Sequence, residues 1–282
     1  MILLWLLLGG IACSLLGLSA LRVLDARDDR AQWRRLAALQ PADPVRFDPR
    51  RVEGLPEPAR RFFGFAIAPG TPLLTVAELH MGGEFSLGPP DRPVYQPMDA
   101  RQILAAPEGF LWTLRLPNGV SGSDFGSPAR GWTRFRIFGL VPVARLGGAR
   151  DHTRAAFGRY VAEALFWTPA ALLPRPGVTW EALGEDAARV TVTAGDLSQA
   201  VDVRLDAEGR PLVVEFQRWS DANPERRYRL QPFGGFLSDF REVQGFRVPF
   251  AVEAGSMFGT ERYFPFFRAR LKSVRFPPSP HP

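Results

Sequence analysis

Apolar and polar positions along this chain follow two different periods. A three-and-four spacing of apolar residues makes residues 154–174 the only long soluble segment with a helical pattern. Thr168 and Pro169 then predict a break, followed by a short second turn that ends at Pro174. The expected apolar face carries Phe157, Val161, Ala164 and Leu165, whereas Arg154, Arg159 and Glu163 fall elsewhere.

Alternation of apolar and polar residues predicts β-strands through most of the remaining chain. Val190 and Val192, for example, point to one side of a strand, and Thr191 and Thr193 to the other. No second helical block that could form parallel crossovers is evident, so the strands are expected to form an antiparallel meander. A stretch rich in glycine and serine, residues 118–129, is predicted to be a flexible loop. The predicted strands cover residues 74–87, 101–105, 110–116, 131–138, 189–193, 201–205, 212–216, 227–230, 246–253 and 263–276.

A shorter helix is predicted just before the first strand. Pro56 and Pro58 are typical of a helix start, and Pro69 lies beyond its expected end. This helix is expected to hold Phe62 and Phe63 against the domain.

The first 21 residues carry no charged side chain. At about 1.5 Å per residue, a helix of this length roughly matches the hydrocarbon core of a bilayer. The basic start and the cleavage site of a signal peptide are not evident, and Cys13 lacks the usual lipoprotein sequence before it, so we expect an uncleaved membrane anchor. The residues that follow favour a cytoplasmic domain by the positive-inside rule, because they include Arg22, Arg27, Arg30, Arg34 and Arg35.

Composition narrows the range of partners. The net charge of +6 comes almost wholly from arginine, and no basic run with interleaved aromatic residues is present, so no nucleic-acid partner is expected. Cys13 is the sole cysteine, and His80, His152 and His281 are widely separated. Neither a metal site nor a cofactor is therefore expected.

Carboxylates are the best candidates for catalysis in this sequence. Glu163 lies four residues after Arg159 on the predicted helix, and the plainer interpretation of this spacing is an ion pair on the helix surface. Asp239 and Glu242 flank a predicted turn, where polar residues are common. The segment Gly119-Val120-Ser121-Gly122-Ser123 lacks the last glycine of a nucleophile elbow, so we do not expect an enzyme.

Four segments carry a resemblance to a known superfamily. Residues 240–249 (FREVQGFRVP) are similar to a strand-turn-strand pattern of the LolA/LolB-like lipoprotein carriers, in which a glycine turn precedes an apolar strand with proline. Together with residues 55–63 (LPEPARRFF), 138–145 (FGLVPVAR) and 159–174 (RYVAEALFWTPAALLP), they resemble an uncharacterised bacterial membrane-anchored domain family with that fold. The resemblance implies an apolar concavity that receives acyl chains in the carriers, and no reaction.

The predicted fold class is α+β, mainly β. The resemblance implies an incomplete, curved antiparallel barrel with a central helix over its concave face, to which the sequence adds one N-terminal transmembrane helix. The predicted organisation is an anchor at 1–24, a juxtamembrane helix and proline-containing linker at 25–54, the half-barrel domain at 55–276, and a proline-rich tail at 277–282.

Three functions are consistent with these patterns. The first is a membrane-tethered, non-catalytic module of the cell envelope that binds a lipid, a lipoprotein acyl chain or another apolar ligand. The alternatives are a structural or protein-interaction domain with a solid core, and an enzyme that uses Glu163 or Asp239. For the first function, the resemblance favours an extracytoplasmic domain on the inner membrane, against the arginine pattern. Its groove is expected to be lined by Phe157, Tyr160, Val161, Leu165, Trp167 and Leu172.

Overall fold

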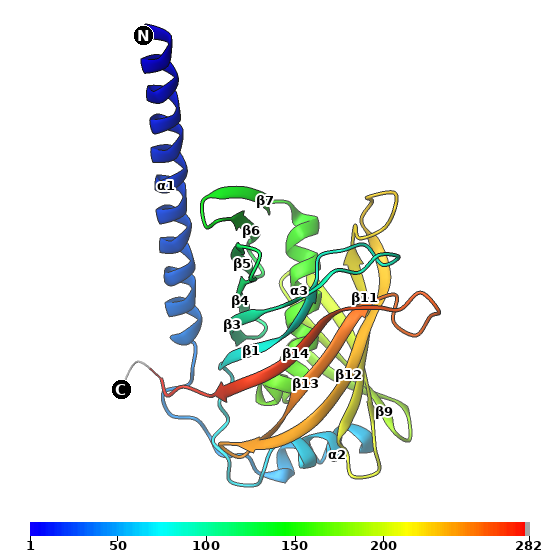
Figure 1. Cartoon of the computed structure of the whole chain (residues 1–282). Helices are drawn as coiled ribbons and strands as arrows, with labels where there is room; N and C mark the ends of the chain where they lie inside the picture. The colour runs from blue at the N-terminus through cyan, green and yellow to red at the C-terminus, as the bar shows by residue number, and fades with distance from the viewer. Residues whose placement is uncertain (280–282) are drawn as a thin grey trace.

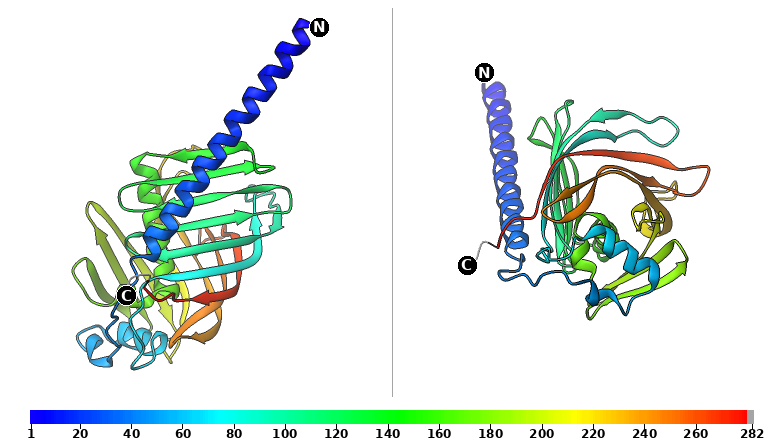
Figure 2. Two further views of the ribbon diagram at one scale, coloured as in Figure 1. Left: turned by 90° about the vertical axis from the view of Figure 1, so that its left-hand side faces the viewer. Right: turned by 90° about the horizontal axis from the view of Figure 1, so that it is seen from below.

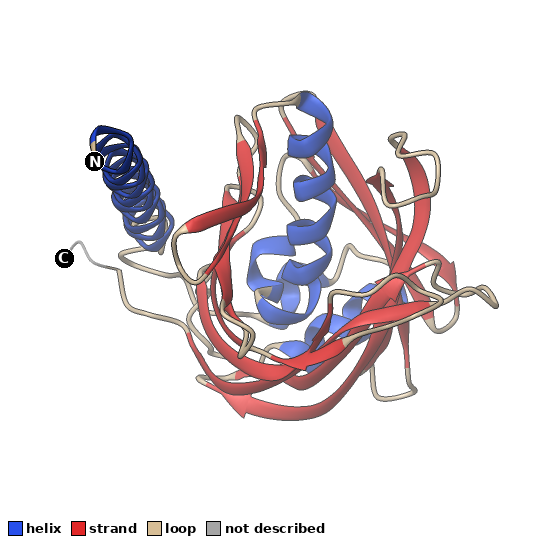
Figure 3. Ribbon diagram, turned by 45° about the horizontal axis from the view of Figure 1, so that its top comes forward, coloured by secondary structure: helices blue, strands red, loops and turns tan. Residues whose placement is uncertain are grey.

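In the computed structural model, which describes residues 1–279, one long antiparallel sheet bends around a single helix (Figure 3). Its strand order is β7-β6-β5-β4-β3-β1-β14-β13-β12-β11-β10-β9-β8, and the short β2 pairs with β1. β7 and β8 are the two edges, so the barrel is incomplete, and the predicted fold class is confirmed. The strands are β1 (Ala77–Ser86), β2 (Tyr95–Pro97), β3 (Asp99–Ala105), β4 (Gly109–Arg115), β5 (Val120–Gly126), β6 (Gly131–Ile137), β7 (Val141–Gly147), β8 (Val178–Gly184), β9 (Ala187–Ala194), β10 (Leu197–Leu205), β11 (Pro211–Ser220), β12 (Arg229–Val243), β13 (Phe246–Ser256) and β14 (Phe264–Arg275).

The helix inside the sheet is α3 (Arg150–Trp167), and the 3₁₀ turn η2 (Pro169–Leu172) follows it. α3 connects the two edge strands, β7 and β8, and therefore runs across the concave face. The predicted break at Thr168 and Pro169 is confirmed, whereas the helix begins four residues earlier than the pattern indicates. The main hydrophobic core lies between α3 and the concave face.

A single helix, α1 (Ile2–Ala37), runs from the N-terminus to the outside of the sheet (Figures 1 and 2). It is long and apolar enough to cross a membrane, and its most apolar part is not buried against the domain. Its C-terminal end packs on the convex face through Trp33, Leu36 and Ala37, in a second core with Phe125 and Trp132. The division at residue 24 stays a prediction; the helix itself continues unbroken across that position.

Charged groups attach α1 to strands β6 and β7. The Asp25 carboxylate is buried and forms ion pairs with Arg134, Arg136 and Arg145. Nη1 of Arg145 lies 2.7 Å from Oδ2 of Asp25, and Nη1 of Arg134 lies 3.1 Å from Oδ1. Since removing one partner of a buried ion pair leaves an uncompensated charge, these contacts hold α1 in a defined position on the sheet.

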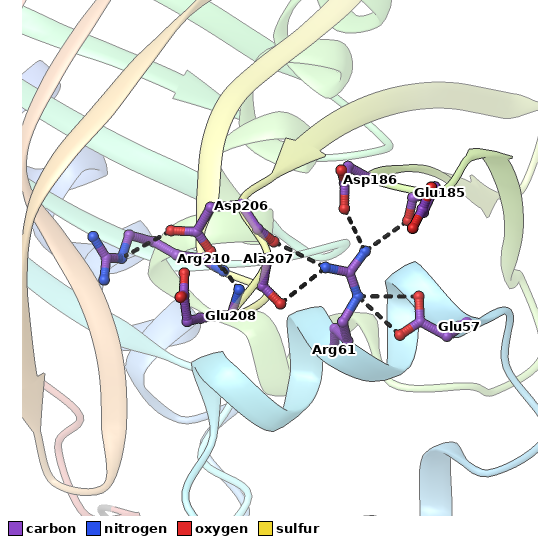
Figure 4. A network of polar contacts seen from close by, with 8 residues as sticks. All are labelled: Glu57, Arg61, Glu185, Asp186, Asp206, Ala207, Glu208 and Arg210. Atoms are coloured by element: carbon purple, nitrogen blue, oxygen red, sulfur yellow. Dashed lines mark hydrogen bonds and ion pairs between the residues drawn. The ribbon is translucent and has the colours of Figure 1, made fainter.

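The lower end of the half-barrel is closed by α2 (Glu57–Ala66), which follows the 3₁₀ turn η1 (Pro49–Val52). Phe62 and Phe63 are fully buried, so the predicted short helix is confirmed. On its other side Arg61 donates to the backbone carbonyls of Glu185, Asp206 and Ala207 at 2.6–3.1 Å, and pairs with the carboxylates of Glu57 and Asp186 (Figure 4). One side chain thus joins α2 to two turns of the sheet.

One element contradicts the expectation from sequence. Residues 118–129 are not a flexible loop, because they contain β5, which pairs with β4 and β6 in the sheet. A Cβ added at Gly122 would lie 2.0 Å from the carbonyl oxygen of Arg134, so the small residues allow close packing of strands here. β7 and β8 were also not predicted. Of the predicted tail, residues 280–282 lie outside the described part of the chain.

Candidate functional site

A cavity of about 460 Å³ lies between α3 and the concave face of the sheet. Its wall is mostly apolar and includes rings from both halves of the sheet as well as from α3. This volume falls within the range of roughly 300–1,000 Å³ that is common for ligand pockets. The aromatic residues of the wall are Phe85, Trp112, Phe135, Phe166, Trp167, Phe216, Phe233, Phe266 and Phe267.

The rings of the wall support one another by edge contacts. Phe85 lies 5.9 Å from both Trp112 and Phe266, measured between ring centroids, and Phe233 lies 5.9 Å from Phe266. Such T-shaped and tilted pairs stabilise the arrangement beyond simple burial. Because the rings pack against one another, they hold the wall of the cavity in place.

The mouth of the cavity lies near the β6–β7 hairpin. Leu87 and Val143 line the cavity and are exposed to solvent at the same time. Phe135 and Ala144, which pair across β6 and β7, continue the wall inward from there. The part of the wall formed by Phe135, Val143 and Ala144 is therefore apolar up to its solvent-exposed end.

Arg159 of α3 forms a charged network in the cavity wall. Its Nη1 lies 2.6 Å from Oδ2 of Asp124 on β5, and its Nε lies 2.7 Å from Oε1 of Glu163. Gln102 donates to the other oxygen of Glu163 at 2.5 Å, and Thr133 donates to the other oxygen of Asp124 at 2.8 Å. Burial works against the charge of Arg159, but the two carboxylates outweigh it and raise the pKa of Arg159 above its usual value.

The second arginine of the wall, Arg218 on β11, is bonded differently. Its guanidinium carbon lies 4.7 Å from the ring centroid of Phe233, and its buried Nε has no hydrogen-bond partner among residues 1–279. Burial, reinforced by the nearby charge of Arg159, lowers the pKa of Arg218 to about 10. The side chain therefore still carries its positive charge at neutral pH.

Of the six residues predicted to line a groove, the cavity wall contains Trp167. The other five lie in the main core on the opposite side of α3 and η2, and the OH group of Tyr160 donates to the carbonyl of Pro107 at 3.1 Å. The helix face that lines the cavity instead carries Arg159, Ala162, Glu163 and Phe166. The five core residues are Phe157, Tyr160, Val161, Leu165 and Leu172.

The carboxylates considered for catalysis are not brought together. The predicted ion pair of Glu163 with Arg159 is confirmed, but the pair lies in the cavity wall and is not exposed on the helix surface. Asp239 and Glu242 are exposed on β12, and Asp239 pairs with Arg241 at 2.7 Å. In the part of the chain that the structure describes, no group of three or more His, Cys, Asp or Glu side chains has the arrangement to hold a metal ion.

The fold and the cavity define an open antiparallel half-barrel with one helix across its interior. Residues 45–269 match the model of a family of unknown function, DUF6544, and the chain belongs to that family. A search of the curated proteins gives no match.

Several solved structures are similar to this chain. A LolA superfamily protein from Nitrosomonas europaea shares 11% identity with a TM-score of 0.43, covering 78% of this chain and 92% of that chain. A putative outer membrane lipoprotein-sorting protein domain from Vibrio parahaemolyticus shares 11% identity, with a TM-score of 0.40 and coverage of 78% and 89%. A DUF1329 family protein from Desulfovibrio piger shares 10% identity, with a TM-score of 0.42 and coverage of 78% and 90%.

The network around Arg159 predicts a large loss of stability when the arginine is removed. Arg159→Met leaves two carboxylates without their cation inside the wall, and we expect the free energy of unfolding to fall by about 3–5 kcal/mol. The measurement is urea unfolding of the detergent-solubilised chain.

The matched control is Arg150→Met at the start of the same helix. Arg150 pairs with Asp196, but its side chain is 78% exposed, so the loss should be much smaller. Equal losses in the two variants would contradict the structural role assigned to the buried network.

Proposed function

We propose that this protein is a membrane-tethered, non-catalytic module that binds a lipid, an acyl chain or another apolar ligand in the cavity beside α3. The observation that carries the proposal is an apolar cavity of about 460 Å³ whose mouth is itself lined by exposed apolar residues. A domain built only for protein contacts has no need of such a space, because closing it would increase packing and stability.

The tether is α1, and the first 21 residues of the chain have the length and composition of a membrane span. The ion pairs of Asp25 hold the β6–β7 hairpin, which carries the exposed cavity residue Val143, close to the end of that segment. An extracytoplasmic position on the inner membrane stays a prediction, since the arginines after Leu21 favour the opposite side.

Substitution of a residue on the cavity-facing side of α3 tests the proposal that the cavity binds an apolar ligand. Ala162 lines the cavity, so Ala162→Trp should fill it and weaken binding of a fluorescent fatty acid by tenfold or more, with little change in unfolding temperature. Binding is measured by fluorescence titration of the full chain in amphipol.

The control substitution is Val161→Trp. Val161 is fully buried in the core and is not part of the wall, so overpacking should cost roughly 1–3 kcal/mol while the folded protein keeps its affinity. If the wild-type chain shows no saturable binding, or if Ala162→Trp binds as well as wild type, the structural alternative with a solid core is favoured instead.

A further inference from the structure

The cavity wall contains a second, half-buried cation, Arg218, that forms no ion pair with the carboxylates of the wall. The acidic residues of the wall, Asp124 and Glu163, are each bonded to Arg159. Arg218 contacts the face of the Phe233 ring, and its Nε has no hydrogen-bond partner among the described residues 1–279. A buried N–H donor without a partner is costly, and a bound water, ion or ligand can satisfy it.

We propose that Arg218 binds the anionic head group of a single-chain amphiphile whose hydrocarbon chain fills the aromatic part of the cavity. This inference rests on the proposed function and names its ligand class. A guanidinium offers a planar pair of N–H donors that matches a carboxylate or a phosphate. The unbonded N–H of Arg218 thus provides the site for the head group, and the surrounding aromatic rings provide the site for the hydrocarbon chain.

Arg159 has a different part in this site. Because its two carboxylates already occupy its Nε and Nη1 atoms, it holds β5 against α3 and is not the head-group partner. Arg218 lies on β11, and its Nε–H group is available to donate to a head group.

The head group could come from a free fatty acid or from the phosphate of a lysophospholipid. The experiment therefore uses three probes: palmitate, its neutral analogue 1-hexadecanol, and a lysophosphatidate of the same chain length. Native mass spectrometry of the full chain, released from non-ionic detergent, measures the occupancy of each probe. Wild type should take up at least one acidic probe about tenfold or more above the alcohol, and the acid with the higher occupancy identifies the source.

The variant that tests the assignment is Arg218→Met. It should remove the preference for the acid and keep the occupancy by the alcohol, while Arg218→Lys keeps part of the preference. Because an unpaired buried charge is removed, the unfolding temperature of Arg218→Met should equal or exceed that of wild type. The control is Arg154→Met, which removes an exposed arginine over the ring of Trp219, outside the cavity wall, and should leave the preference unchanged.

Equal uptake of acids and alcohol by wild type, or an unchanged preference in Arg218→Met, would overturn the head-group assignment and leave the proposed function standing. Uptake of none of the three probes would overturn both. The wild-type comparison does not depend on any variant, so it decides the question even if Arg218→Met fails to fold.

A separate observation concerns the exposed apolar residues of the β6–β7 hairpin, residues 131–147. Phe138 at its turn is 79% exposed, and Val141, Val143 and Leu146 are exposed beside it. β7 is also an edge strand. Exposed apolar edges promote aggregation unless something covers them, so this surface requires a cover.

The position of the hairpin relative to α1 indicates what covers its exposed apolar residues. Arg22 is the first charged residue after the apolar part of α1, and a Cβ added at Gly139 would lie 3.3 Å from its Nη1 atom. The Asp25 ion pairs fix the same hairpin to α1 within one turn of that point. We infer that the turn around Phe138 lies in the interface of the bilayer that α1 crosses.

The test uses a fluorescent probe sensitive to polarity. Cys13→Ser removes the sole native cysteine, and Phe138→Cys or, as control, Leu183→Cys then carries the label. Leu183 is an exposed apolar residue on β8, close to the turn that Arg61 of α2 holds. The labelled full chain is inserted into vesicles of phosphatidylcholine and phosphatidylglycerol.

The probe at position 138 should emit as in an apolar medium and be quenched by spin-labelled lipid, whereas the probe at 183 should be quenched by aqueous iodide. Quenching of both probes by iodide to the same extent would overturn the interfacial position. Failure of the chain to float with the vesicles would count against the membrane tether itself.

Discussion

α3 joins β7 at one edge of the sheet to β8 at the other and crosses the concave face, where its apolar residues are buried. One helix cannot fill the space that so long a curved sheet encloses. On one side α3 packs into a continuous core through Phe157, Val161 and Leu165, and on the other it leaves the cavity. The polar residues of that second side are then buried by necessity, and the pairing of Arg159 with Asp124 and Glu163 compensates their charge.

Regular alternation and helix signals made much of this fold predictable. The strands from β9 to β14, the helix α2 and the break at Thr168 follow from local patterns that packing does not override. β5 was missed because glycine and serine replace the apolar positions, and Gly122 is needed for the approach of the neighbouring strand, a requirement that appears only with the partner in place. Local rules therefore predict elements whose side chains separate core from water. They failed for β5, which lies in the interior of the sheet, and for the largely exposed edge strands β7 and β8.

The cavity was predicted in kind but not in its residues. The helical pattern identified an apolar face and took it for the groove, whereas that face forms the core and the polar face lines the cavity. Arg159 and Glu163 were assigned to the surface because polar residues usually face water; their partner Asp124 comes from β5, 35 residues earlier than Arg159. Nothing in the sequence marked Arg218 as a site residue, because a single arginine in a strand of alternating apolar and polar residues is expected on the side that faces solvent. A site whose chemistry depends on which charges are left unpaired requires the three-dimensional structure.

The central claim is that the space beside α3 holds an apolar chain. It is tested most directly by mass spectrometry of the organic extract of the full-length protein, purified in parallel with Ala162→Trp. The account predicts a compound with a long hydrocarbon chain, in near-stoichiometric amount, in the wild-type extract and strongly depleted in the variant. Extracts that contain the same compounds in the same amounts, or nothing beyond the detergent, would contradict it.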